Sequence, residues 1–168
     1  SLEILLYAMS KLKDHPLGNK IRLILLGDGA RKRFLKKEAN RLNLTNVIFV
    51  DTVSKEQVSD FWSILDISII HLKKTELFKT VIPSKLFECM GMGLPVLHGV
   101  EGESAEIVRK TRCGVLFEPE NENQLIDKLL YLKSEPAYLE ILRQNALDSA
   151  KKYDRTNLAR QMLDSLNL

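Results

Sequence analysis

Ser84, Lys85 and Glu88 have the residue types and the spacing needed to bind a nucleotide. Pro83 suits the first turn of a helix, where its missing N–H costs nothing, and Ser84 can cap the free amides that follow. Unpaired amides and a partial positive charge at such a helix start favour a phosphate. Glu88, one turn further along, can accept two hydrogen bonds from the vicinal hydroxyls of a ribose. This stretch therefore predicts a site for a phosphate and a ribose.

A helix, a turn and a strand must position these residues. Apolar residues at helical spacing predict that one face of the helix from Pro83 packs on a sheet, and they make Glu88 a candidate for a buried carboxylate. This face consists of Leu86, Phe87 and Met90. The glycines in 91–93 end the helix, and the apolar run 94–97 is typical of a covered parallel strand.

Several segments, taken in order, resemble the nucleotide-sugar-binding half of GT-B glycosyltransferases of the family 4 type. They are Leu25–Gly29, Asn46–Phe49, Leu65–Ser68, Pro83–Lys85, Phe87–Glu88, Met90–Val96 and Gly114–Phe117. The resemblance covers nearly the whole chain and implies an α/β fold, with a Rossmann-like open parallel sheet flanked by helices. Residues 1–168 are then expected to form a single donor-binding domain, truncated at its N-terminal edge, with C-terminal helices at about 136–168. In the resembled fold the last of these helices, marked by Leu158, Met162 and Leu166, crosses back onto the missing half, so its apolar residues are expected to be exposed in this chain.

The same resemblance implies roles for individual residues. Glu88 corresponds to the second glutamate of the family's Glu-x7-Glu pattern, which holds the donor ribose. The first glutamate falls at position 80, where this chain has Thr80, so a neighbour such as Glu76 or Lys79 is expected to supply the contact to the donor sugar. The base is expected to stack near Val53 and to be read by backbone groups. The alternative for Val53 is a plain strand end before a helix cap.

Gly27 and Gly29 follow the apolar run 21–26, and their turn is expected to let a diphosphate or sugar approach the backbone. The rival interpretation is the dinucleotide fingerprint Gly-x-Gly-x-x-Gly, with Asp51 as the acidic residue about twenty positions on. Lys32 occupies the place of the third glycine, which normally lets helix and strand pack closely. The substitution favours the diphosphate or sugar turn.

The stretch 71–80 carries charge without clear periodicity, which predicts a loop after a central strand. Ligands collect at the carboxyl ends of such strands, so His71, Lys73 and Lys79 are candidates to face a donor sugar or phosphate. A lone histidine is more often structural, and this alternative stays open for His71 and weighs more heavily for His98.

The resemblance implies transfer of a sugar from a UDP-sugar, or another NDP-sugar, to a lipid-linked or glycan acceptor, with retention of anomeric configuration. The chain resembles bacterial family members that build surface polysaccharides. No Asp-x-Asp motif appears, so a metal-independent reaction without a cofactor is expected, in which the helix start at Ser84 and Lys85 stabilises the leaving diphosphate. The sequence leaves the catalytic residues unassigned.

The partners expected are the nucleotide sugar and an N-terminal acceptor-binding domain of the same protein, which would carry the acceptor site and phosphate-neutralising residues. The chain alone is therefore expected to bind weakly and to turn over little. A non-catalytic Rossmann-like nucleotide-binding or regulatory module is the alternative, and a dinucleotide-dependent enzyme is the third.

Composition is ordinary for one globular domain, with 45% hydrophobic and 28% charged residues and a net charge of +3. The basic residues in 31–37 alternate with apolar ones as on a solvated helix face; weak attraction to acidic lipid headgroups is the alternative, and nucleic acid is not indicated. Cys89 and Cys113 are expected to be buried free thiols. They favour a reducing cytoplasm, with the inner face of the membrane as the alternative location.

Overall fold

A computed structural model describes residues 2–166, apart from the side chains of Lys55, Arg155, Thr156, Leu158 and Gln161. Short helices and strands alternate through the first two thirds of the chain, and helices alone follow. The strands are β1 (Leu23–Leu26), β2 (Val47–Val50), β3 (Ser68–His71), β4 (Val96–Gly99) and β5 (Gly114–Leu116). The helices are α1 (Glu3–Leu12), η1 (Gly18–Lys20), α2 (Lys32–Arg41), α3 (Lys55–Ser63), η2 (Glu76–Thr80), α4 (Ser84–Gly91), α5 (Glu103–Thr111), α6 (Glu122–Ser134), α7 (Pro136–Ala150), η3 (Lys151–Tyr153) and α8 (Arg155–Leu166).

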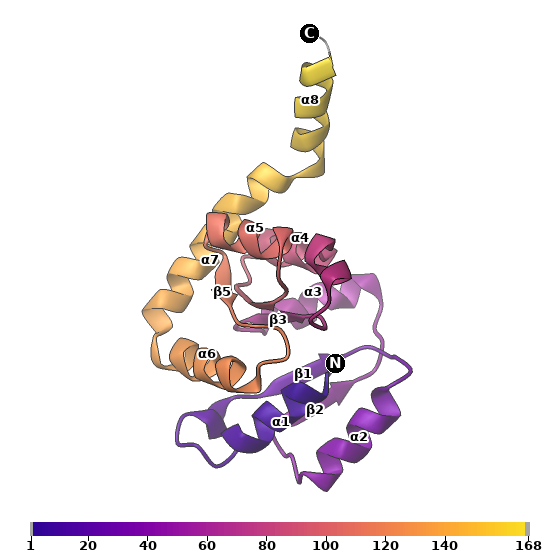
Figure 1. Cartoon of the computed structure of the whole chain (residues 1–168), viewed down its shortest axis with the longest axis vertical. Coiled ribbons are helices and arrows are strands. Elements are labelled where there is room, and N and C mark those ends of the chain that lie inside the picture. Colours follow the sequence, from indigo (N-terminus) through magenta and orange to yellow (C-terminus); the bar gives the residue numbers. More distant parts are fainter. Residues whose placement is uncertain (1, 167–168) are drawn as a thin grey trace.

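The strands form two parallel sheets, with the orders β1-β2 and β3-β4-β5 (Figure 1). Leu23 pairs with Val47, and Val96 lies between Ser68 and Gly114. The predicted class, parallel strands flanked by helices, is confirmed. Within residues 2–166 the strands fall into two hydrogen-bonded groups, and the outer strands of these groups, β1, β2, β3 and β5, each pair on one side only. The ladder therefore has an open edge on β1 and another on β3.

Two apolar clusters hold the fold together. The first joins α1, α2 and β1 to Leu97 of β4 and Phe117 after β5, so one core spans both sheets. The second lies beneath α4, α5 and α7 and contains Leu86, Met90 and both cysteines. The predicted packing face of α4 is thus confirmed, and Cys89 and Cys113 are buried free thiols, as expected. Burial raises the pKa of both thiols, so they remain protonated.

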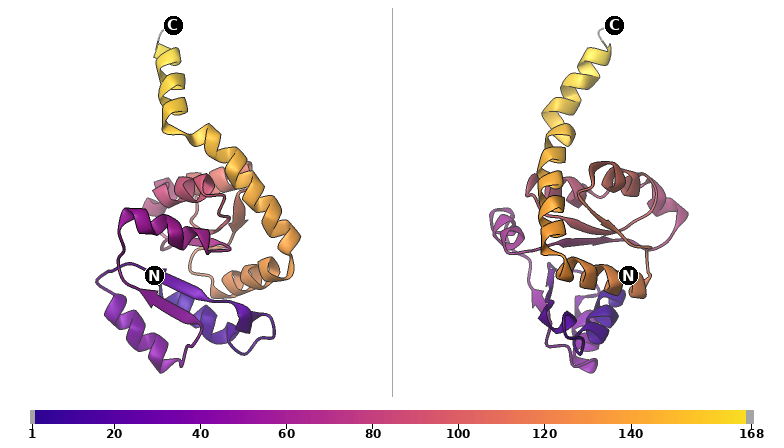
Figure 2. Two further views of the ribbon diagram at one scale, coloured as in Figure 1. Left: turned by 180° about the vertical axis from the view of Figure 1, so that it is seen from behind. Right: turned by 90° about the vertical axis from the view of Figure 1, so that its left-hand side faces the viewer.

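The C-terminal helices begin at Pro136, as predicted, and α7 packs along α4 before the chain leaves the body of the protein as α8 (Figure 2). Met162, Leu163 and Leu166 of α8 are 59% to 68% exposed, which agrees with the expectation that this helix presents apolar residues outwards. The predicted contribution of Leu158 lies outside the described side chains. None of the described helices combines the length and the apolar character that a membrane span requires.

Candidate functional site

The start of α4 is where the sequence predicted it, but its capping differs from the prediction. Pro83, in an extended conformation, is the N-cap residue, and Ser84 is the first helical residue and caps nothing. Pro83 suits this place for two reasons. Its rigid ring favours the non-helical backbone of an N-cap residue, and the helix does not require a hydrogen bond from the N–H that proline lacks. In the part of the chain that the structure describes, no side chain caps α4. The amides of Ser84 and Lys85 are therefore free to bind an anion or water.

Glu88 lies one turn into α4 and is exposed, so the expectation of a buried carboxylate is wrong. Leu86, Cys89 and Met90 take the buried face, and helical geometry turns position 88 away from them. Glu88 instead shares an outward face with Ser84 and Lys85, which lie four and three residues before it. Among residues 2–166 nothing pairs with its carboxylate, which keeps all its acceptor sites for water or a ligand.

Residues 76–80, predicted as loop, form the 3-10 helix η2, which Thr75 caps by accepting a hydrogen bond from the Phe78 amide at 3.3 Å. Thr80 is exposed, and its hydroxyl donates to the Leu77 carbonyl at 2.9 Å. Lys79 and Glu76 form an ion pair at 2.6 Å. The two residues expected to replace the family glutamate at position 80 therefore bind each other.

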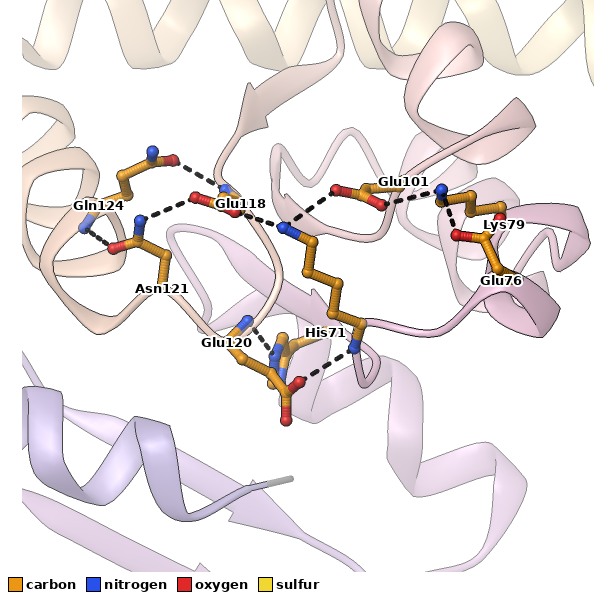
Figure 3. Close-up of polar contacts among 9 residues, drawn as sticks. His71, Glu76, Lys79, Glu101, Glu118, Glu120, Asn121 and Gln124 are labelled. Atoms are coloured by element: carbon orange, nitrogen blue, oxygen red, sulfur yellow. Dashed lines mark hydrogen bonds and ion pairs between the residues drawn. The ribbon is translucent and has the colours of Figure 1, made fainter.

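His71 is an anchor for the loop that follows it. Its Nε2 accepts a hydrogen bond from the Glu120 amide at 3.2 Å (Figure 3). Its ring stacks on Phe117, with ring centroids 5.9 Å apart. Burial lowers the pKa of His71 to about 4, so the ring is neutral at pH 7. Lys74 completes the attachment: its amide donates to Glu120 at 3.1 Å and its ammonium group donates to Glu118 at 2.5 Å. The structural interpretation of His71 thus has direct support.

Lys32 joins the turns that follow β1 and β2. Its ammonium group lies 2.6 Å from Asp51 and 2.9 Å from Asp28, and it donates to the Val50 carbonyl at 3.3 Å. Hydrogen bonds to the two carboxylates raise the pKa of Lys32 and lower theirs. In a dinucleotide site this place holds a glycine and an open backbone cradle. The geometry therefore disfavours the dinucleotide interpretation.

The predicted site residues fall into two groups in space. Pro83, Ser84, Lys85 and Glu88 follow Thr80 at the second sheet, whereas Gly27, Gly29 and Val53 lie in the turns after β1 and β2 of the first sheet. Gly27 has φ +118, which favours glycine in that turn. Within the described residues no hydrogen bond or ion pair connects the two groups.

Sequence reasoning missed three glutamates near the second sheet, Glu101, Glu118 and Glu120. All three follow the carboxyl ends of β4 and β5, which was the available signal. Glu118 and Glu120 also line an open hollow of about 430 Å³ that reaches Lys11. Over residues 2–166 no group of three or more His, Cys, Asp or Glu side chains is arranged to hold a metal ion.

Parallel strands alternating with helices, and a helix start with free amides after β3, define one Rossmann-like half of a GT-B fold. The family model described as "Glycosyl transferases group 1" matches residues 1–149, and the chain belongs to this family.

Individual relatives agree with the family assignment. Sulfoquinovosyl transferase SQD2 of Arabidopsis thaliana is 26% identical over 157 residues, covering 92% of this chain and 28% of SQD2. Anabaena Alr3699/HepE in complex with UDP is similar with a TM-score of 0.82 and 20% identity, over 99% of this chain and 45% of that one. The C-terminal domain of LpcC, a group 1 family protein from Francisella tularensis, has a TM-score of 0.73 and 20% identity, over 91% of this chain and 79% of that one.

The chain spans 28% of the curated relative and 42% of WaaG, another glycosyltransferase of similar fold. At 20% identity, the solved structures establish the fold of this chain and not its ligands.

Proposed function

We propose that this chain is the donor-binding half of a retaining glycosyltransferase, which moves a sugar from a UDP-sugar, or another NDP-sugar, to a lipid-linked or glycan acceptor in surface polysaccharide synthesis. The observation that carries the proposal is the uncapped start of α4, where Ser84, Lys85 and Glu88 share one exposed face. Membership of the glycosyl transferase family supports it. So do the HepE complexes with UDP and UDP-glucose and the role of WaaG in lipopolysaccharide biosynthesis.

In this proposal the donor lies across the carboxyl ends of the strands. The diphosphate binds the α4 amides and the Lys85 ammonium group, and Glu88 accepts hydrogen bonds from the ribose hydroxyls. The base lies near Val53, and the turn at Gly27 and Gly29 leaves the backbone open to the diphosphate or sugar. As the sugar departs, negative charge grows on the diphosphate, and the fixed α4 dipoles stabilise it without a metal ion.

The rest of the protein supplies the acceptor site in this proposal, through an N-terminal acceptor-binding domain. In this proposal the remaining polypeptide also completes the sheet, because β1 and β3 each have an edge that is unpaired within residues 2–166, and such an edge is a template for another strand. One parallel strand from the remaining polypeptide, hydrogen-bonded to both edges, would unite the two sheets. The reaction is assigned to the cytoplasm, with weak attraction of the exposed basic residues of α2 to the inner face of the membrane.

Isothermal titration with UDP tests the ribose assignment. Glu88→Ala is expected to weaken UDP binding about tenfold or more, because hydrogen bonds to a charged group are lost. Glu103→Ala, at an exposed glutamate on α5, is the matched control and is expected to bind UDP like the parent. Equal UDP affinity in the Glu88→Ala variant and the parent would show that the ribose assignment is wrong.

A thermal-shift panel of UDP, GDP and NAD separates the three classes of function. We expect UDP to raise the melting temperature most, because a ligand that binds only the folded state stabilises that state by an amount that increases with its affinity. Stronger stabilisation by NAD would favour the dinucleotide enzyme instead. No response to any nucleotide would leave a non-catalytic module that does not bind nucleotides.

A further inference from the structure

We propose that Glu101 supplies the carboxylate that binds the donor sugar, in place of the glutamate that Thr80 replaces, and that the site therefore selects neutral sugars. This inference rests on the proposed function and deepens it. Four observations carry it: the engagement of the residues around position 80, the approach of the β4–α5 turn to those residues, the placement of the Glu101 carboxylate between two lysines, and its remaining hydrogen-bonding capacity.

The residues around position 80 have no free carboxylate. The Thr80 hydroxyl, which is uncharged, donates to the Leu77 carbonyl of its own turn. Glu76 is held by Lys79 at 2.6 Å, and its side chain is 89% exposed. A sugar beside the end of η2 must therefore find its acceptor on another element.

The turn between β4 and α5 brings Glu101 to the end of η2. Gly102, with φ +76, packs so closely on the backbone of Lys79 that an added Cβ would lie 2.0 Å from the Lys79 carbonyl oxygen. Only glycine permits this approach. Glu101 is thereby fixed beside residues 79–80, which lead through 81–83 into the start of α4.

Two ammonium groups hold the Glu101 carboxylate in position. One carboxylate oxygen lies 3.9 Å from Lys74 Nζ and the other lies 4.0 Å from Lys79 Nζ, one on each side (Figure 3). Each lysine also has a nearer carboxylate, Glu118 at 2.5 Å or Glu76 at 2.6 Å. The five side chains form a row of alternating charge that links η2, the β4–α5 turn and the β5–α6 turn.

The Glu101 carboxylate remains available to a ligand. Distances of 3.9 Å and 4.0 Å are too long for direct hydrogen bonds, so its lone pairs are free, and its side chain is 34% exposed. Such a carboxylate can accept two hydrogen bonds from neighbouring hydroxyls of a hexose. It repels the carboxylate of a uronic acid, because like charges at short range are unfavourable. Neutral hexoses and N-acetylhexosamines are the substrate class that it fits.

Titration calorimetry of the chain with UDP, UDP-glucose, UDP-N-acetylglucosamine and UDP-glucuronate tests the proposal. We expect the parent to bind at least one of the two neutral UDP-sugars more tightly than UDP, and more tightly than UDP-glucuronate. Glu101→Gln is expected to bind that sugar nucleotide about tenfold more weakly while its UDP affinity changes less than about twofold. Glu103→Gln, exposed on the same turn of chain, is the matched control and should match the parent throughout.

A second variant tests the same idea if Glu101→Gln folds poorly. Thr80→Glu adds a carboxylate at the position that Glu101 is proposed to serve, so in the parent background it should bring no gain in sugar affinity. A gain on adding this glutamate would show that the site lacks a carboxylate and would overturn the proposal. In the Glu101→Gln background, Thr80→Glu is expected to restore the lost affinity.

Two results separate this inference from the proposed function. If Glu101→Gln loses no preference for sugar over UDP, or loses both affinities equally, the role of Glu101 is refuted while the donor-binding function stands. If the parent binds none of the UDP-sugars and neither UDP nor GDP, both are refuted.

Discussion

At the scale of single residues, His98 shows how a predicted candidate acquires a different role in the fold. The residue is completely buried at the end of β4, and its Nε2 lies 2.7 Å from the Ser104 hydroxyl. Gly102 is the N-cap residue of α5, and Ser104 lies inside its first turn. The pair therefore joins β4 to α5 within the core and offers no surface to a ligand.

Burial of His98 predicts that acid destabilises the protein. Its pKa is lowered to about 4 by burial, whereas an unfolded histidine titrates near 6.5, so between these values the unfolded chain binds more protons. Stability should thus fall as the pH drops, with His98 contributing about 2 kcal/mol between pH 7 and pH 5. Urea denaturation at both pH values measures this difference. His98→Gln should lose that part of the pH dependence, and a variant with the parent's full dependence would contradict the neutral buried ring.

At the scale of elements, the carboxyl-end side of the second sheet depends on contacts between turns. The chain from 71 to 80 has no periodicity of its own, yet it is ordered by its contacts with the turns that follow β4 and β5. Gly102 is central to this arrangement, because the β4–α5 turn meets η2 there. Three residues, 81–83, separate η2 from the start of α4, which depends on the same support.

Gly102→Ala is therefore expected to destabilise the protein by about 2 kcal/mol or more. Alanine disfavours φ +76, and its Cβ would overlap the Lys79 carbonyl at 2.0 Å. Gly91→Ala is the control, since Gly91 is helical, has no positive φ and has nothing within 4 Å of an added Cβ. That change should be neutral or slightly stabilising. Denaturant unfolding of both variants measures the contrast, and equal effects at the two glycines would mean that the turn does not pack as described.

At the scale of the whole molecule, one body carries both sheets and a single helix projects from it. Leu97 and Phe117 belong to the same cluster as α1 and β1, so the two sheets share a core although no ladder joins them. By contrast, α8 lies apart from this body, and its described side chains Met162, Leu163 and Leu166 are exposed (Figure 1). The residues up to η3 should therefore account for most of the stability of the protein. The exposed helix α8 should instead affect self-association.

A chain ending at Asp154 tests this division. We expect its melting temperature to stay within about 3 °C of the parent, because few contacts are lost. We also expect less concentration-dependent self-association, because an exposed apolar surface is removed. Calorimetry and light scattering over a range of protein concentrations measure the two quantities. Leu142→Ala, at a buried position of α7, is the destabilised reference and should cost about 3 kcal/mol. A comparable loss on truncation would place α8 within the cooperative fold.

Local pattern was sufficient for most of the elements. The apolar spacing of 86–90 predicted the buried face of α4, and the apolar run 94–97 overlaps the strand β4. These features depend on residues within about one helical turn of each other, or on a short run of apolar residues, so they can be read directly from the sequence. The family signature between Pro83 and Val96 could be recognised for the same reason, because its residues are close together in the chain.

What the sequence determined by itself is therefore the order of most helices and strands, and the family. The tertiary structure alone decided that Glu88 faces outwards, that Lys32 joins Asp28 to Asp51, and that Glu101 lies between Lys74 and Lys79. Lys74 and Glu118, which form an ion pair, are 44 residues apart in the chain. They come together only because β3, β4 and β5 pair in parallel, which places the loops after these strands at the same edge of the sheet. Such contacts depend on how the turns after different strands pack against each other at the edge of the sheet. The spacing of residues along the chain does not determine that packing.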